Sequence, residues 1–243
     1  VNDGGEETLL LRDTNIVVDT RTEANVDKLT PPSSVLKYSP RVINSYVPYG
    51  RRVCIQNYKV HIQTLQMIKV YLTNMKKKTI TLLGGSGFLA KYCISELLKD
   101  GHKVVVVCRN PYLAGDLRMM GSLDQLDICS GDIINKDSIE PFIRGSDIVI
   151  NLVGILYESG RNQTFQNCHT LGAKNIAELS KKYDVERLIH FSSIGANVDS
   201  ESKYQRSKGL GEKHITEIFP NSTIIRPSIV FGPGDGFFSV QSK

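Results

Sequence analysis

With 243 residues, of which 40% are hydrophobic and 23% charged, the chain has the composition of a soluble globular protein and room for one large domain with an extension or two small ones. The net charge of +5 is spread along the sequence with no basic stripe interleaved with aromatic residues, so we expect no nucleic-acid partner. No apolar run reaches the ~18 residues of a membrane-spanning helix, and the five cysteines show neither a CxxC pair nor metal-ligand spacing, so we expect neither a transmembrane segment nor a metal site.

Residues 1–74 differ in character from the rest of the chain. Turn-forming residues interrupt them, most clearly in the run Pro31-Pro32-Ser33-Ser34, and their apolar residues keep neither the period of a strand nor that of a helix. Their acidic start is unlike a secretory or mitochondrial targeting signal. We therefore predict that residues 1–74 are a poorly structured extension without a packed core of its own, and that residues 75–243 form the folded domain.

From Met75 onward, short apolar strands alternate with helical stretches, which is the pattern of a parallel sheet covered on both faces. The predicted strands are 79–83, 103–108, 126–129, 147–152, 187–192 and 223–226. The predicted helices are 88–99, 137–143, 164–183 and 204–218. The fold class is therefore α/β, with a doubly wound parallel sheet of the Rossmann type.

The first of these strands runs directly into a glycine-rich turn, and a helix follows at once. Strand, glycine turn and helix in this order form the segment that binds the diphosphate of a dinucleotide. Glycine lets the chain reverse tightly and lets backbone N–H groups approach the phosphates, while the helix N-terminus supplies partial positive charge. The residues expected to contact the cofactor here are Gly84, Gly85, Ser86, Gly87, Phe88 and Leu89.

Two residues at later strand ends bear on which dinucleotide binds. Arg109 follows the second strand, where a carboxylate would otherwise bind the ribose hydroxyls of NAD(H). Because a guanidinium can pair with a 2′-phosphate, Arg109 favours NADP(H), with NAD(H) as the alternative cofactor. Asp132 ends the third strand and is placed either to accept a hydrogen bond from the adenine amino group or to cap a turn.

Small residues follow the fourth predicted strand. Asn151, Val153 and Gly154 stand at or just beyond its end, where ligands of open parallel sheets bind. Small side chains there would let a cofactor ribose pass over the strand end. We therefore add these three residues to the expected cofactor site.

Tyr204 and Lys208 form a YxxxK motif at the start of the helix that follows strand 187–192. One helical turn places both side chains on the same face, so the ammonium favours the phenolate and can bind the cofactor ribose. A phenol with a lowered pKa suits general acid/base catalysis, and Ser192 or Ser193 could polarise a carbonyl oxygen. Tyr204, Lys208 and Ser192 are therefore the candidate catalytic residues for carbonyl–alcohol conversion.

In combination, these motifs resemble the extended or atypical branch of the short-chain dehydrogenase/reductase superfamily. The matching stretches are 84–90, 151–154, the Tyr204/Lys208 motif and 226–232. The resemblance implies that residues 75–243 are an NAD(P)-binding Rossmann domain. The last stretch is similar to the RPxxVYG segment that passes the nicotinamide in that branch, which implies that Pro227 contacts the cofactor.

Within this superfamily, residues 76–238 resemble most closely the accessory subunit of respiratory complex I and its bacterial relatives. The stretches 116–121, 189–197 and 231–238 carry this likeness. It implies a bound NADPH that is not turned over and complex I subunits as partners. It also implies a place in the mitochondrial matrix or bacterial cytoplasm, peripherally at the inner face of the respiratory membrane. Because the family continues beyond Phe238, we expect part of the C-terminal region of the family domain to be missing here.

Three functional hypotheses follow. The first is an NADP(H)-binding accessory or assembly subunit of complex I, with a structural cofactor. The alternative is an active NADP-dependent oxidoreductase or epimerase, which the intact Tyr204/Lys208 pair favours and which Ile194-Gly195-Ala196, in place of a VYG-like segment, disfavours. The third is a redox-sensing regulator that binds NADP without catalysis. From the sequence, catalysis by this chain is therefore an open question.

Overall fold

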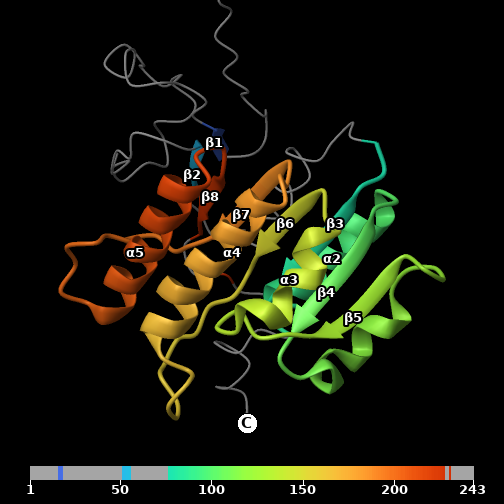
Figure 1. Ribbon diagram of the computed structural model, residues 1–243, viewed down its shortest axis with the longest axis horizontal. Coiled ribbons are helices and arrows are strands. Elements are labelled where there is room, and N and C mark those ends of the chain that lie inside the picture. Colours follow the sequence, from blue (N-terminus) through green and yellow to red (C-terminus); the bar gives the residue numbers. More distant parts are fainter. Residues whose placement is uncertain (1–15, 19–50, 56–75, 228–229, 231–243) are drawn as a thin grey trace, which may run out of the picture.

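The computed structural model describes residues 16–18, 51–55, 76–227 and 230 (Figure 1). Its strands form one sheet in the order β1-β2-β8-β7-β6-β3-β4-β5. The strands are β1 (Ile16–Val18), β2 (Arg51–Ile55), β3 (Thr79–Leu83), β4 (Lys103–Cys108), β5 (Leu126–Ser130), β6 (Ile148–Asn151), β7 (Arg187–Phe191) and β8 (Thr223–Arg226). The helices are α2 (Phe88–Lys99), the 3₁₀ segment η3 (Pro111–Met119), α3 (Lys136–Arg144), the π-helical η4 (Gln166–Leu171), α4 (Gly172–Lys182) and α5 (Lys203–Ile218).

Strands β3 to β8 are all parallel, and this confirms the predicted doubly wound Rossmann fold. Within the part formed by β3 to β8, the chain starts in the middle at β3, adds β4 and β5 on one side, and then crosses to add β6, β7 and β8 on the other. The strand order therefore reverses between β3 and β6. At such a switch point the connections diverge to opposite sides and leave a crevice beyond the strand ends.

The sheet also contains two strands that the sequence analysis did not predict. Strand β2 pairs in parallel with β8, and β1 pairs antiparallel with β2. Both belong to residues 1–74, for which no strand was expected. Strands of three and five residues are too short to show a clear hydrophobic period, and here backbone pairing with neighbouring strands defines them. The rest of residues 1–74, and most of the stretch 226–238, lie outside the described residues.

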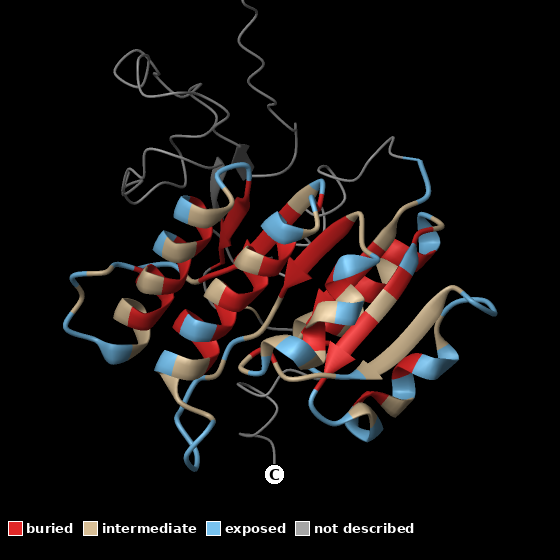
Figure 2. Ribbon diagram, in the orientation of Figure 1, coloured by how far each residue is buried: buried red, intermediate tan, exposed pale blue. Residues whose placement is uncertain are grey.

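Successive strand residues pack into two separate cores, one on each face of the sheet. Ile80 and Leu82 belong to the core under α2 and η3, whereas Leu83 belongs to the core under α3, α4 and α5 (Figure 1). The central strands β3, β4 and β6 are buried along most of their length, while β5 at the edge is only partly covered (Figure 2). Near-continuous apolar runs such as that of β4 are what a strand covered on both faces requires.

No helix within the described part of the chain is long and apolar enough to cross a membrane. Within the same residues, no group of histidine, cysteine and acidic side chains is arranged to hold a metal ion.

Candidate dinucleotide site

The glycine turn after β3 is held tightly against the end of β4. The N–H groups of Gly84 and Gly85 both donate to the carbonyl oxygen of Val107, at 3.0 and 3.4 Å. Gly84 has a φ of +88°, and a Cβ on Gly85 would lie 1.9 Å from a methyl carbon of Val106. Neither position has room or backbone freedom for a larger residue. The turn therefore places backbone atoms that carry no side chain at the switch point.

Helix α2 begins directly after this turn with its first N–H groups uncapped by a side chain. Gly87 is the N-cap residue, and the first turn of the helix carries no acidic residue. The leading N–H groups of a helix have no partner within it and carry partial positive charge, which suits a diphosphate. Ser86 and Gly87 are exposed, and Phe88 and Leu89 are half-buried. The geometry thus fits the predicted cradle.

Arg109 lies just beyond β4 and is exposed. One terminal nitrogen of its guanidinium, Nη2, donates to the side-chain oxygen of Gln163 at 3.0 Å. Among the described residues no carboxylate forms an ion pair with Arg109, so its charge is available to an anion. Pairing of Arg109 with the 2′-phosphate of NADP(H) remains a prediction.

Asp132 shapes the turn that follows β5. Its Oδ1 accepts a hydrogen bond from the backbone N–H of Ile134 at 3.1 Å, and its own N–H donates to the hydroxyl of Ser138 at 2.9 Å. The sequence analysis gave two alternative roles for Asp132, an adenine contact and a turn cap, and this arrangement is the turn cap. The adenine contact itself remains a prediction.

Asn151, at the end of β6, is buried, and both polar atoms of its side chain form a hydrogen bond. Its Oδ1 accepts from the N–H of Val153 at 3.0 Å, and its Nδ2 lies 2.9 Å from Nδ1 of His190. Because the first bond fixes the direction of the amide, Nδ2 is the donor and His190 accepts through Nδ1. Asn151 therefore holds the strand end and the following backbone in place.

His190 was not predicted, and its tautomer follows from this contact. With Nδ1 accepting, the ring carries its proton on Nε2, which is buried without a hydrogen-bond partner among the described residues. Burial, and then the positive charge of Lys208, lower the pKa of His190 well below its usual range. The ring is therefore neutral and presents an unpaired N–H.

Lys208 reaches from α5 to the end of the sheet. Its Nζ donates to the carbonyl oxygen of Phe191 at 3.2 Å, and the side chain is buried. Burial lowers the pKa of Lys208 to about 8, against the opposing charge of Glu212. A Cβ on Gly154 would lie 3.1 Å from this nitrogen, so the glycine gives Lys208 its space. The structure thus brings Lys208 and the 151–154 stretch together.

Tyr204 stands one helical turn before Lys208 and is half-buried. Its ring lies edge-on to the ring of His169, with centroids 5.4 Å apart, and edge-on to Phe165 at 5.6 Å. Helix α5 begins after Ser202, whose hydroxyl accepts from the N–H of Gln205. Aromatic packing against η4 therefore sets the position of the tyrosine.

His169 is the second histidine that the sequence analysis missed. Its Nε2 accepts from the N–H of Ile155 at 3.0 Å, so Nδ1 carries the proton and donates to the hydroxyl of Ser207 at 2.9 Å. Burial, and then Lys208, lower the pKa of His169 to about 3. It lies in the π-helical segment η4, within a stretch predicted as one continuous helix. Wide π turns of this kind often occur at functional sites.

Two further predicted residues lie at the end of β7 and beyond β8. The Ser192 hydroxyl is buried and has no hydrogen-bond partner among the described residues. The N–H of Ile194 donates to the carbonyl oxygen of Pro227 at 2.9 Å, which ties the two connections together. A buried hydroxyl of this kind is a group that a ligand could satisfy.

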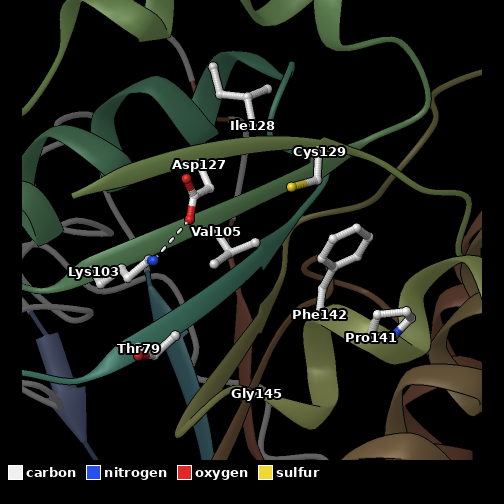
Figure 3. Close-up of a pocket in the computed structure, with 9 residues that line it drawn as sticks. All are labelled: Thr79, Lys103, Val105, Asp127, Ile128, Cys129, Pro141, Phe142 and Gly145. Atoms are coloured by element: carbon white, nitrogen blue, oxygen red, sulfur yellow. Dashed lines mark ion pairs between the residues drawn. The ribbon is translucent and has the colours of Figure 1, made fainter. Parts of the chain in front are cut away.

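A separate hollow of about 460 Å³ lies away from this site (Figure 3). Thr79 and Lys103, which begin β3 and β4, line it together with Phe142 and Gly145 near the end of α3. Lys103 and Asp127 form an ion pair across it at 3.1 Å. It sits at the opposite ends of the strands from the glycine turn, so it is not the dinucleotide site.

Residues 80–241 match the profile of the NAD dependent epimerase/dehydratase family. The chain belongs to this family. This agrees with the glycine turn, the switch point and the YxxxK pair described above. The resemblance to the short-chain dehydrogenase/reductase superfamily is thereby confirmed.

Similar curated proteins include subunits of the mitochondrial NADH dehydrogenase. The chain is 33% identical over 206 residues to the NADH-ubiquinone oxidoreductase 40 kDa subunit of Neurospora crassa, which covers 84% of this chain and 55% of that protein. It is 40% identical over 160 residues to the mitochondrial NADH dehydrogenase [ubiquinone] 1 alpha subcomplex subunit 9 of Mus musculus. This match covers 65% of this chain and 42% of that protein. It is also 26% identical over 168 residues to a ceramide reductase of Caulobacter vibrioides, covering 68% and 51%. This family member therefore spans about half the length of the curated relatives it matches.

Solved structures show the same fold. A putative NAD-dependent epimerase/dehydratase from Bacillus halodurans aligns with a TM-score of 0.56 and 23% identity, covering 65% of this chain and 74% of that one. Yeast methylglyoxal/isovaleraldehyde reductase complexed with NADPH aligns with a TM-score of 0.57 and 21% identity, covering 64% and 59%. At these identities the likeness concerns the fold of this epimerase/dehydratase-family chain and leaves its substrate unassigned.

Proposed function

We propose that this chain is an accessory or assembly subunit of respiratory complex I that holds NADP(H) as a structural cofactor. The observation that carries the proposal is its 33–41% identity to NADH dehydrogenase subunits of Neurospora crassa, Mus musculus and Dictyostelium discoideum. We place it in the mitochondrial matrix, or in the cytoplasm of a bacterium, peripherally at the inner face of the respiratory membrane.

The proposed cofactor is supported by the residues that follow the carboxyl ends of β3 and β4. The turn of Gly84, Gly85 and Gly87 would let the diphosphate approach closely, and the uncapped N–H groups of the first turn of α2 would donate to it. Arg109 would pair with the 2′-phosphate, since its guanidinium has no carboxylate partner among the described residues. When bound, such a cofactor supplies a hydride or accepts one. In the proposed structural role, its binding energy stabilises the folded subunit.

The absence of turnover is proposed from the segment after β7. Ile194-Gly195-Ala196 stands where active relatives of the extended branch carry a VYG-like segment. The Ile194 side chain is 46% exposed, and Gly195 has a φ of +81° that most residues would avoid. The segment therefore offers an apolar side chain and a tight turn that packs against Gln205, the residue after Tyr204.

The test is isolation of the endogenous protein under mild conditions. We expect it to migrate with complex I on a native gel and to release NADP(H), in roughly equal amount to the protein, on denaturation. Migration alone and without other respiratory subunits would overturn the partner assignment. Release of no nucleotide, or of NAD(H) only, would overturn the cofactor assignment.

A second function is favoured by one observation, the placement of the half-buried Tyr204 and the buried Lys208 on successive turns of α5. A lysine with a pKa of about 8 remains largely protonated at neutral pH, and its ammonium could donate to a ribose hydroxyl of the cofactor. Ser192 could then donate a hydrogen bond to a carbonyl oxygen. An active NADP-dependent oxidoreductase or epimerase would turn over a carbonyl or alcohol and lose that activity in Tyr204→Phe. No turnover across a broad substrate panel would exclude it.

A further inference from the structure

One contact spans the proposed adenosine end of the site and links two segments far apart in sequence. Nη2 of Arg109, beyond β4, donates to Oε1 of Gln163, 54 residues later in the loop between β6 and η4. The glutamine is half-buried, although the arginine is exposed. The loop therefore reaches across the strand edge to the residue that would bind a 2′-phosphate.

Backbone hydrogen bonds fix the position of Gln163 within this loop. Its carbonyl oxygen accepts from the N–H of Ser159 at 2.9 Å, in an isolated antiparallel bridge. The carboxylate of Glu158 accepts from the N–H of Phe165 at 2.8 Å, and the amide of Asn167 donates to the carbonyl of residue 162 at 3.1 Å. The backbone on both sides of Gln163 is thus anchored, so its side chain extends from a defined point.

We propose that Gln163 is a specificity-determining residue that orients Arg109 for the 2′-phosphate of NADP(H). The inference rests on the proposed function, because it assigns a second residue to the same phosphate site. No sequence motif marks Gln163, and the sequence analysis did not select it.

The chemistry of the two side chains supports an orienting role. A guanidinium has five N–H donors, and Gln163 occupies a donor on one terminal nitrogen only. The remaining donors are enough for a forked contact with a phosphate. Because the carboxamide is neutral, it leaves the positive charge of Arg109 intact.

Orientation also reduces the entropy that binding must remove. A free arginine side chain samples many rotamers, and a phosphate must restrict them when it binds. Gln163 restricts them in advance, so the same phosphate contact forms at a smaller entropic loss. NAD(H), which has no 2′-phosphate, gains nothing from this arrangement. The effect of Gln163 should therefore be confined to the phosphorylated cofactor.

The experiment measures the dissociation constants of NADPH and NADH by isothermal titration calorimetry with the full chain. For Gln163→Ala we expect NADPH binding to weaken about five-fold, as for loss of one hydrogen bond. For Gln163→Glu we expect about ten-fold or more, because a carboxylate neutralises Arg109 and repels the phosphate. NADH binding should change less than about two-fold in both variants.

Two further variants separate the possible results. Arg109→Met should abolish the preference for NADPH, and Asn162→Ala, one position from Gln163, should leave it unchanged. Thermal unfolding of each variant checks that it is folded. If Arg109→Met loses the preference but both Gln163 variants bind NADPH like the wild type, or weaken both cofactors equally, the role of Gln163 is wrong and the proposed cofactor stands. If the wild type shows no preference and Arg109→Met changes nothing, the proposed cofactor is wrong as well.

Discussion

Two histidines and a lysine form a buried polar group at the strand edge, where β6, β7, η4 and α5 meet. His169 and His190 are held neutral, and Lys208 carries the only charge among the three at neutral pH. His169 uses both ring nitrogens, one toward the loop after β6 and the other toward Ser207 of α5. At this scale, a buried hydrogen bond positions Lys208, and ring contacts position Tyr204.

The first prediction concerns the hydrogen bonds of His169. In His169→Phe, the N–H of Ile155 loses its acceptor and the Ser207 hydroxyl loses its donor in a buried region. We expect a loss of about 2 kcal/mol or more in the free energy of unfolding, measured by urea denaturation. His214→Gln on α5 is the control and should change little. Equal stability of His169→Phe and the wild type would contradict the assigned role.

The second prediction concerns pH. The folded-state pKa of His169, about 3, lies below its value in the unfolded chain, about 6.5. The unfolded chain therefore binds more protons between these values, and stability falls as the pH is lowered from about 6.5 toward 3. The slope from this residue is at most about 1.4 kcal/mol per pH unit. His190 acts in the same direction.

The measurement for this prediction is the free energy of unfolding of the wild type and His169→Gln between pH 7 and pH 4. Glutamine cannot titrate, so the variant should lose stability less steeply on acidification. Identical slopes for the two proteins would show that His169 does not titrate as described.

At the scale of elements, glycines set how closely α5 approaches the rest of the molecule. A Cβ on Gly211 would lie 2.3 Å from the carbonyl oxygen of His169 in η4. A Cβ on Gly209 would lie 2.5 Å from the carbonyl carbon of Asn197. Helix α5 carries Tyr204 and Lys208, so this close packing also places those two side chains over the strand ends.

The third prediction tests that packing. Gly211→Ala must push α5 away from η4, and we expect about 1–3 kcal/mol of destabilisation, typical of overpacking. Gly145→Ala is the matched control, because nothing lies within 4 Å of its Cβ position. Both are measured by urea denaturation, and a loss in Gly145→Ala as large as that in Gly211→Ala would refute the packing argument.

A buried ion pair connects α5 to β8. Nε and Nη2 of Arg226 donate to the two carboxylate oxygens of Glu212 at 2.8 and 2.6 Å, and both side chains are buried. Removing one partner leaves an uncompensated charge in the interior. Since Pro227 follows Arg226 directly, this pair also fixes where the chain leaves the sheet toward the proposed nicotinamide segment.

The fourth prediction follows from this pair. Glu212→Gln should lower the free energy of unfolding by about 3–5 kcal/mol, the usual result of breaking a buried ion pair. Glu217→Gln, whose ion pair with Lys213 is exposed, should change it by less than about 1 kcal/mol. Chemical denaturation curves measure the free energy of unfolding of both variants. Equal losses in the two variants would contradict the prediction.

At the scale of the whole molecule, the sequence was sufficient for the parallel sheet and the helices around it. Strands β3, β4 and β8 and helix α2 have the predicted bounds, because apolar runs and turn residues mark them locally. Strands β1 and β2 were missed, since pairing with the sheet edge orders them. The predicted helix 164–183 is divided into η4 and α4, where contacts with neighbouring elements override local helix propensity.

The residues of the candidate site also fall into two groups, those that the sequence predicted and those that it did not. The glycine turn, Arg109, Tyr204 and Lys208 were predictable because strand ends of a parallel sheet meet at one edge. His169, His190 and Gln163 were not, because each matters through a contact between segments 14 to 54 residues apart. Their residue types and spacing alone carry no signal of those contacts.

The central claim is that the start of α2 holds a dinucleotide diphosphate. The most direct measurement is the NADPH affinity of Gly87→Glu by calorimetry. Gly87 has a φ of −77°, and the nearest atom to a Cβ there is 3.3 Å away, so the fold should accept the side chain with little adjustment. Its carboxylate would repel the diphosphate, and we expect NADPH affinity to fall at least about ten-fold. Unchanged affinity in a folded Gly87→Glu variant would contradict the account.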